Sequence, residues 1–126
     1  MKDFTCNLFI RESAEIIFNA ITNPVTIELW SGYPAVMQAS PDTEFSLWDG
    51  DITGRNLSVE SPVKLVQEWY FEDNNPPSIV IIQLTEGKGK TRIDLVHTNI
   101  PEDAFLNIRE GWRKYYLGAL KKYLES

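Results

Sequence analysis

The stretch FLNIREGWRKYYLGALKKY, residues 105–123, decides the fold of this 126-residue chain. At 100° per residue eight of its side chains fall within about 140° of arc, so the stretch predicts a long amphipathic helix with one wide apolar face. That face carries Phe105, Ile108, Trp112, Tyr115, Tyr116, Ala119, Leu120 and Tyr123. Gly111 and Gly118 share one flank, where we expect another backbone to approach closely, because glycine is otherwise unfavourable inside a helix. The apolar face needs a covering element.

The residues before this helix predict a strand, two short helices and a series of antiparallel strands. Strict alternation over residues 4–10 predicts the first strand. Ser13 is a good cap for a first helix, and Asn23-Pro24 both ends that helix and begins a second one that closes near Gly32.

Further strands are expected at residues 45–48, 51–59, 65–71, 78–85 and 91–98. Asp49-Gly50 predicts a two-residue hairpin turn, and Gly54 predicts a bulge or a close backbone contact. Residues 72–77 end in two prolines, which cannot continue strand pairing. Because the connections are short, the sheet should be an antiparallel meander. The chain is therefore expected to be an α+β fold, with a curved sheet of about six to seven strands wrapped around the C-terminal helix and an apolar pocket between them.

The composition of the chain excludes several classes of function. With 43% hydrophobic and 24% charged residues, the chain predicts a single globular domain spanning residues 1–126. The net charge of −6 argues against nucleic-acid binding. Cys6 and His97 are the only residues of their types, so neither a metal site nor a cofactor is predicted. No stretch of the sequence has the pattern of a membrane span or of a leader, and together with the lone cysteine this predicts a cytoplasmic protein.

Charge is distributed unevenly along the chain. Residues 28–86 carry a net charge of −8, and residues 87–126 carry +3. Arg109, Arg113 and Lys114 are therefore a candidate partner surface, although an ordinary solvated helix face explains the same pattern.

His97 is the only side chain that would exchange a proton near neutral pH without a perturbed pKa. It shares strand parity with Ile93 and Leu95, which would place it toward the pocket. No nucleophile motif accompanies it, so a structural or ligand-orienting role is favoured over catalysis. On the strand over residues 65–71, the face with Trp69 should point inward, because Glu68 lies on the other. The predicted cavity lining is Trp30, Trp48, Trp69, Phe71, Leu95, His97, Phe105, Ile108, Trp112, Tyr115, Tyr116 and Ala119.

Five stretches in this order resemble a known family. They are IRESAEIIFNAITNP (10–24), WDGDITG (48–54), SPVKLVQEWYF (61–71), KTRIDLVHTNIP (90–101) and GWRKYYLGALKKYL (111–124). They resemble the C-terminal domain of the activator of the 90-kDa heat-shock protein ATPase and its free-standing homologues, in the START-like or SRPBCC superfamily with its helix-grip fold. The family often has two glycines where this chain has Asp42-Thr43.

The resemblance implies a non-enzymatic, stress-related binding module whose partner is the 90-kDa heat-shock chaperone. The two-domain co-chaperones carry an additional N-terminal domain for which 126 residues leave no room, which puts full co-chaperone activity in question. An alternative is a carrier or sensor of a small hydrophobic ligand such as a lipid, a sterol or a polyketide-like molecule. A third, less favoured reading is a cyclase or hydrolase that uses His97.

Overall fold

A computed structural model describes residues 1–71 and 76–126 of the chain. The elements are β1 (Lys2–Ile10), α1 (Ala14–Thr22), α2 (Pro24–Ser31), β2 (Thr43–Leu47), β3 (Ile52–Glu60), β4 (Lys64–Tyr70), β5 (Ser78–Glu86), β6 (Thr91–Ile100), α3 (Phe105–Glu110), a π-helical segment (Gly111–Tyr116) and α4 (Leu117–Glu125). The turn predicted over residues 72–75 lies outside the described residues.

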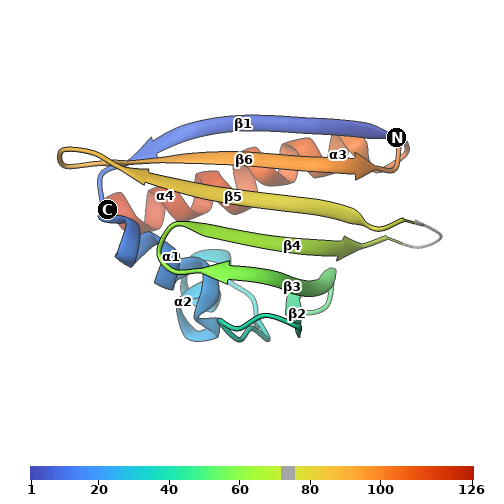
Figure 1. Ribbon diagram of the computed structural model, residues 1–126, viewed down its shortest axis with the longest axis horizontal. Coiled ribbons are helices and arrows are strands. Elements are labelled where there is room, and N and C mark those ends of the chain that lie inside the picture. The colour runs from blue at the N-terminus through green and yellow to red at the C-terminus, as the bar shows by residue number, and fades with distance from the viewer. Residues whose placement is uncertain (72–75) are drawn as a thin grey trace.

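The strands form one antiparallel sheet in the order β1-β6-β5-β4-β3-β2. This is the predicted meander, with β1 added at the edge beside β6. Figure 1 shows the C-terminal helix running along one face of the sheet, with α1 and α2 near one end of it. The predicted helix-grip architecture is confirmed.

The inner face of the sheet carries the core. Leu65, Gln67 and Trp69 are buried on β4, as predicted from the placement of Glu68 on the other face. They lie in the same layer as buried residues of β5, β6 and the C-terminal helix, such as Ile82, Leu95 and Leu120. The apolar face of the last helix is thus covered by the sheet, which removes both surfaces from water.

The first two helices begin and end at the predicted residues. Ser13 Oγ accepts a hydrogen bond from the Ile16 amide at 3.3 Å, and Asn23 Oδ1 accepts one from the Val25 amide at 3.0 Å. Gly32 ends α2 with a φ of 84°, a left-handed conformation that costs glycine little.

The first hairpin differs from its prediction. Its loop spans four residues, 48–51, because the last ladder pair is Leu47 with Ile52. Trp48 and Asp49 both have positive φ, at 50° and 53°. Trp48 leaves the strand and its ring contacts other aromatic rings inside the molecule, and this tertiary packing outweighs the two-residue turn preference of Asp49-Gly50.

The close backbone contact predicted at Gly54 is confirmed. A Cβ at this position would overlap the Glu68 carbonyl oxygen and come within 2.7 Å of the Phe45 ring. Only glycine allows β3 to pack so closely at this point.

The C-terminal helix departs from regular α-helical spacing. The Leu117 amide donates to the Trp112 carbonyl, five residues earlier, which is the π-helical pattern. The wider turn rotates the later residues away from the positions expected at 100° per residue. As a result Tyr115 is 61% exposed and Tyr123 is also exposed, although both were predicted on the covered face, while Leu117 is buried at 3%.

The two helix glycines have different roles. A Cβ at Gly118 would overlap the Arg113 carbonyl of the same helix, five residues earlier, whereas a Cβ at Gly111 would meet open space. The expected approach of another backbone is therefore wrong. At Gly118 the close contact comes from the π-helical turn itself.

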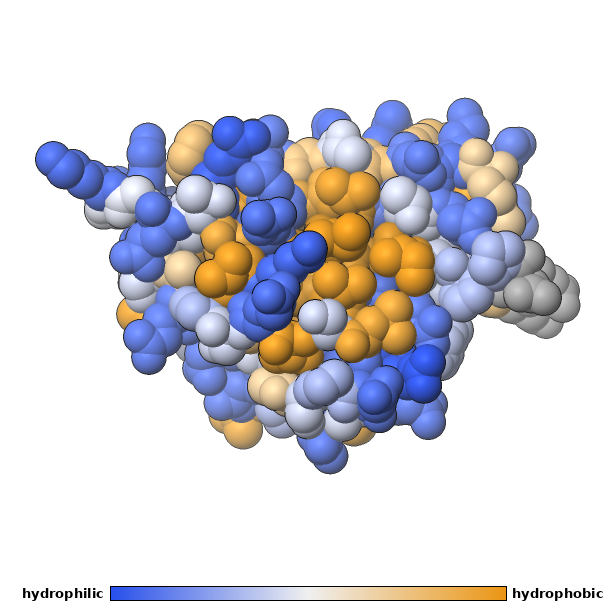
Figure 2. Space-filling view, in the orientation of Figure 1, coloured by the Kyte–Doolittle hydropathy of each residue, from blue (hydrophilic) through white to orange (hydrophobic). Residues whose placement is uncertain are grey.

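The outer face of the sheet is also apolar at its centre. Val66, Ile81 and Val96 lie in one row across β4, β5 and β6 and are half-buried. Figure 2 shows hydrophobic residues gathered on the middle of this face, with polar residues around them.

Candidate functional site

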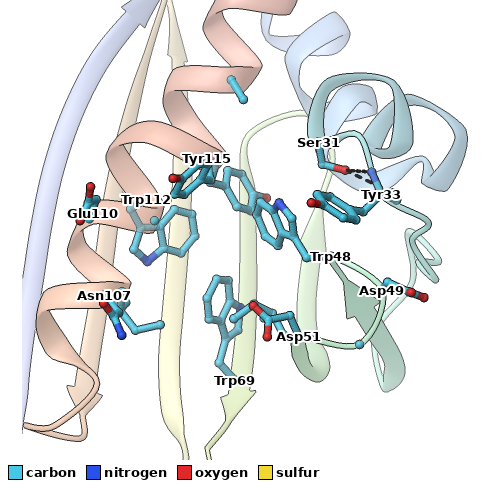
Figure 3. A pocket seen from close by; sticks show the side chains of 16 residues that line it. Ser31, Tyr33, Trp48, Asp49, Asp51, Trp69, Asn107, Glu110, Trp112 and Tyr115 are labelled. Carbon is cyan, nitrogen blue, oxygen red and sulfur yellow. Dashed lines mark hydrogen bonds between the residues drawn. The ribbon is translucent and has the colours of Figure 1, made fainter.

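An open cleft of about 1110 Å³ lies between the C-terminal helix, the end of α2 and the β2–β3 turn. Figure 3 shows Trp112 and Tyr115 on the helix side, Trp69 on the sheet and Tyr33 across the gap. Seven of the predicted cavity residues line it: Trp48, Trp69, Ile108, Trp112, Tyr115, Tyr116 and Ala119.

Four aromatic rings form a continuous wall of the cleft. Trp69 stacks on Trp112 with ring centres 4.9 Å apart and planes at 21°. The ring centres of Trp112 and Tyr116 are 4.5 Å apart, and those of Tyr116 and Trp48 are 5.8 Å apart. Because these rings come from β4, the C-terminal helix and the β2–β3 turn, the wall exists only in the folded chain.

A chain of buried amides fixes the orientation of Trp69. Its Nε1 donates to Gln67 Oε1 at 2.9 Å, and Gln67 Nε2 donates to Asn56 Oδ1 at 2.9 Å. Asn56 Nδ2 in turn donates to the carbonyl oxygen of Gln38 at 2.9 Å. Both amide side chains are buried, so the polar groups are satisfied inside the core, as buried polar groups require.

His97 lies behind the wall and does not line the cleft. Its Nδ1 accepts a hydrogen bond from Trp112 Nε1 at 3.0 Å, and its side chain has no exposed surface. Burial lowers the pKa of His97 to about 4, so the ring is neutral at pH 7 and its proton sits on Nε2. Nε2 has no hydrogen-bond partner among the described residues. This geometry makes His97 a support for Trp112.

Four more predicted cavity residues lie outside the cleft lining. Trp30 is buried behind Trp48 and Tyr116, and its Nε1 donates to the Ala20 carbonyl at 2.8 Å. Leu95 is a buried core residue. Phe71 is half-buried beside His97. Phe105 is half-buried at the start of α3, and Lys2 Nζ lies 5.4 Å from the centre of its ring.

Sequence reasoning missed the polar rim of the cleft. The rim includes Ser31, Tyr33, Asp49, Asp51, Asn107 and Glu110. Two signals pointed to part of it. The Asp-rich hairpin turn and the Gly32-Tyr33-Pro34 segment both connect elements at the open end of the gap between helix and sheet, where loops carry binding residues.

The predicted partner surface lies on the outer side of the same helix. Arg109, Arg113 and Lys114 are exposed and, with Leu106 and Glu110, line a shallow hollow of about 410 Å³. We call these five residues the basic surface. Leu106 is 65% exposed, so the basic surface also offers an apolar side chain.

Local contacts hold the cations of the basic surface. The guanidinium of Arg113 lies 5.6 Å from the Phe4 ring centre. Lys114 Nζ lies 2.8 Å from a Glu110 oxygen, and this hydrogen bond raises the pKa of Lys114 and lowers that of Glu110. The two arginines therefore carry most of the unpaired positive charge.

The structure gives two further findings about the described residues. No group of three or more His, Cys, Asp or Glu side chains is arranged to hold a metal ion in residues 1–71 and 76–126. Within the same residues, none of the helices is both long enough and apolar enough to cross a membrane.

The sequence of the chain matches a family model and several curated proteins. The family model described as Activator of Hsp90 ATPase homolog 1-like protein matches residues 11–125. The human Activator of 90 kDa heat shock protein ATPase homolog 1 is 23% identical over 124 residues, which cover 94% of this chain and 37% of that protein. The chain thus spans just over a third of that curated relative.

Two solved structures share the fold. The structure of PFC0360w, an HSP90 activator from Plasmodium falciparum, matches with a TM-score of 0.89 and 26% identity over 98% of this chain and 96% of that one. Protein MLL2253 from Mesorhizobium loti matches with a TM-score of 0.85 and 21% identity, covering 98% and 97% of the two chains.

Proposed function

The chain belongs to the family of Activator of Hsp90 ATPase homolog 1-like proteins, and we propose that it is a non-enzymatic binding module that contacts a 90-kDa heat-shock chaperone through its basic surface. The human relative and the Plasmodium falciparum protein are both named as activators of this chaperone. The proposal includes the cytoplasmic location expected from the sequence.

One observation carries the choice of surface. Arg109 and Arg113 stand one helical turn apart on an acidic protein, with the exposed side chain of Leu106 beside them. Arginine next to an exposed apolar residue is a common composition of protein interfaces. Such a surface suits an acidic segment of a partner that also carries an apolar side chain.

Isothermal titration of the chaperone with this protein tests the proposal. The double variant Arg109→Glu/Arg113→Glu is expected to weaken binding at least about tenfold, because two attractive charges become repulsive. Lys122→Glu is the matched control, since Lys122 is exposed on the same helix but outside the basic surface. Equal binding by the double variant and the unaltered protein would contradict the proposal.

The chaperone's ATPase rate, measured in the same mixtures, addresses activation separately. Because the chain spans 37% of the human relative, we propose binding by this domain and a smaller stimulation than that given by a full-length activator. The double variant should lose whatever stimulation the unaltered protein gives.

A second candidate function rests on the aromatic cleft. The cleft borders the wall of four contacting rings and is also lined by the exposed rings of Tyr33 and Tyr115, which favours binding of a small ligand with an apolar body. A thermal-shift panel of sterols, fatty acids and flavonoids tests it, because a ligand that binds only the folded state raises the melting temperature. Melting temperatures that none of these compounds changes would count against this use of the cleft.

Catalysis by His97 is the least supported reading. Its ring lies behind Trp69 and Trp112, and its Nδ1 is occupied by the hydrogen bond from Trp112. A general base must reach the proton that it abstracts, and His97 does not reach the cleft in this geometry.

A further inference from the structure

The two edges of the sheet differ in how they are covered. At the β2 edge, Val36 and Ser46 exchange two backbone hydrogen bonds of 2.9 Å, so a loop covers part of that strand. At the opposite edge β1 pairs with β6 and, among the described residues, with no other strand. Figure 1 shows β1 along the border of the molecule, with no other element beyond it. An uncovered edge strand can pair with another chain.

The bonding pattern of the sheet shows which residues of β1 face away from β6. In the β5–β6 hairpin the Gly87 amide donates to the Lys90 carbonyl at 2.8 Å, so Lys90 and every second residue after it on β6 face β5. Leu95 therefore faces β1, where it lies opposite Cys6. It follows that Cys6 bonds to β6, and that the residues on either side of it direct their N–H and C=O groups outward.

Thr5 and Asn7 thus present four backbone groups on the free side of β1. Both residues are exposed, and within the part of the chain that the structure describes no loop, cap or side chain bonds to these groups. Further along, Lys121 Nζ donates to the carbonyl of Phe9 at 2.6 Å, which agrees with the alternation and closes the edge there. We call Thr5 and Asn7 the open edge.

Three cations lie beside the open edge, on the helix side of β1. The guanidinium of Arg113 lies 5.6 Å from the ring centre of Phe4. Lys2 Nζ and the guanidinium of Arg109 lie 5.4 Å and 5.9 Å from the ring centre of Phe105. None of the three cations forms an ion pair with another described residue. Alternate side chains of a strand added at the open edge would lie next to these cations.

The same cations argue against a second copy of this chain as the added strand. If β1 paired antiparallel with β1 of another copy, the helix sides of both copies would lie on the same face of the joint sheet. The two Arg113 side chains would then approach each other near the two-fold axis and repel. A segment with carboxylates would be attracted instead.

We propose that the open edge accepts an extended acidic segment of the partner as an added strand. The backbone of the segment would bond to Thr5 and Asn7, and its alternate Asp or Glu side chains would face Lys2, Arg109 and Arg113. In strand addition of this kind, backbone bonds supply affinity and alternate side chains supply specificity. The inference rests on the proposed function, whose basic surface includes both arginines, and adds the conformation of the bound segment.

Hydrogen exchange of the whole chain, followed amide by amide in proton–nitrogen spectra, tests strand addition. The probe is a peptide of sequence Glu-Thr-Glu-Val-Glu-Thr-Glu with both ends capped, in which carboxylates alternate with uncharged residues. When the peptide is bound, the amides of Thr5 and Asn7 should exchange at least about threefold more slowly, because they become hydrogen-bonded. Those of Cys6 and Leu8 are already bonded to β6 and should change little.

Two kinds of related peptide separate charge from strand pairing. A peptide with Lys in place of each Glu should give no protection, since its charges are repelled. N-methylation of every second residue, made in both phases, keeps the carboxylates. One phase should bind at least about fivefold more weakly than the other, because only alternate N–H groups of a strand face its neighbour. Equal binding of the two phases, or of the Glu and Lys peptides, would overturn the inference.

Thr5→Pro tests the same contact with the chaperone itself. Proline removes the N–H at the open edge and places its ring there, so chaperone affinity in isothermal titration should fall at least about fivefold. Glu44→Pro in β2 is the matched control. The backbone groups of Glu44 also face away from the neighbouring strand, because those of Ser46, two residues later, bond to Val36. The peptide measurements use the unaltered chain, so they remain decisive if Thr5→Pro does not fold.

The results separate failure of this inference from failure of the proposed function. Chaperone binding that Arg109→Glu/Arg113→Glu abolishes and Thr5→Pro leaves unchanged would overturn strand addition and keep the basic surface. Protection by the acidic peptide without chaperone binding would support the acidic strand and overturn the chaperone as the partner. Protection of Thr5 and Asn7 that rises with protein concentration alone would assign the open edge to a second copy and overturn the inference.

Discussion

At the scale of the residue, His97 is a titratable group whose role is to hold a neighbouring ring in place. Its ring has no exposed surface, and it accepts the indole N–H of Trp112. The bond fixes the ring that stacks on Trp69 in the cleft wall. Burial keeps the imidazole neutral at pH 7, so this support depends on the imidazole remaining unprotonated.

The depressed pKa makes stability depend on pH. His97 titrates at about 4 in the folded chain and near 6.5 when unfolded. Between these values the unfolded state binds a proton that the folded state does not, so the free energy of unfolding falls as pH falls. From pH 7 to pH 5, His97 alone should remove about 2 kcal/mol.

Urea unfolding at both pH values measures this loss. The variant His97→Gln cannot titrate, so its loss between pH 7 and pH 5 should be smaller by about the same amount. Equal losses in the two proteins would show that His97 is not neutral and buried as described.

Gln67 is a second residue on which the cleft wall depends. It accepts from Trp69 and donates to Asn56, both at 2.9 Å. Gln67→Leu should lower the free energy of unfolding by about 2 kcal/mol or more, because two buried polar groups lose their partner. Gln83→Leu on the exposed side of β5 is the control and should change stability little. Chemical denaturation of both variants gives the comparison, and similar losses would contradict the network.

At the scale of the element, the π-helical segment determines which side chains of the C-terminal helix face inward. The segment places Trp112, Tyr116 and Leu117 inward together and leaves Tyr115 at the cleft edge. Residues spaced at 3.6 per turn would not produce this arrangement.

The two helix glycines test that geometry as a pair. Gly118→Ala should destabilise the protein by about 1–3 kcal/mol, because the added methyl overlaps the Arg113 carbonyl. Gly111→Ala should stabilise it by up to about 1 kcal/mol, since its methyl meets open space and alanine favours the helix. Thermal melts of the two variants should therefore move in opposite directions. Stabilisation by both would indicate a regular α-helix.

The elements themselves were predictable from the sequence, because alternation, caps and helical periodicity are local signals. Ser13, Asn23 and Gly54 acted as their residue types predict. The π-helical turn was not predictable, since nothing in the composition of Gly111–Tyr116 distinguishes five-residue from four-residue bonding. The cleft was predicted only in part. Strand parity placed His97 inward, but only the packed side chains show that Trp69 and Trp112 separate it from the opening.

At the scale of the whole molecule, the surface has an acidic region at the cleft rim and a separate basic region. The acidic cleft rim and the basic surface flank the same C-terminal helix on different sides. The two proposed sites therefore overlap only at Glu110, which borders both the cleft and the basic surface.

This division predicts a salt response for the partner site. Chaperone binding through Arg109 and Arg113 should weaken several-fold as salt rises from about 0.05 M to about 0.3 M, because exposed charges are screened. Titrations at the two salt concentrations measure it. Affinity that does not change with salt would point to an apolar contact such as the outer sheet face.

The most direct test of the central claim is a proton–nitrogen correlation spectrum of the labelled protein titrated with the chaperone. The basic-surface account predicts saturable shifts at the amides of Leu106, Arg109, Arg113 and Lys114, with the indole signals of Trp48 and Trp69 in the cleft unchanged. Shifts confined to the cleft or to the outer sheet face, or a spectrum that the chaperone leaves unchanged, would contradict it.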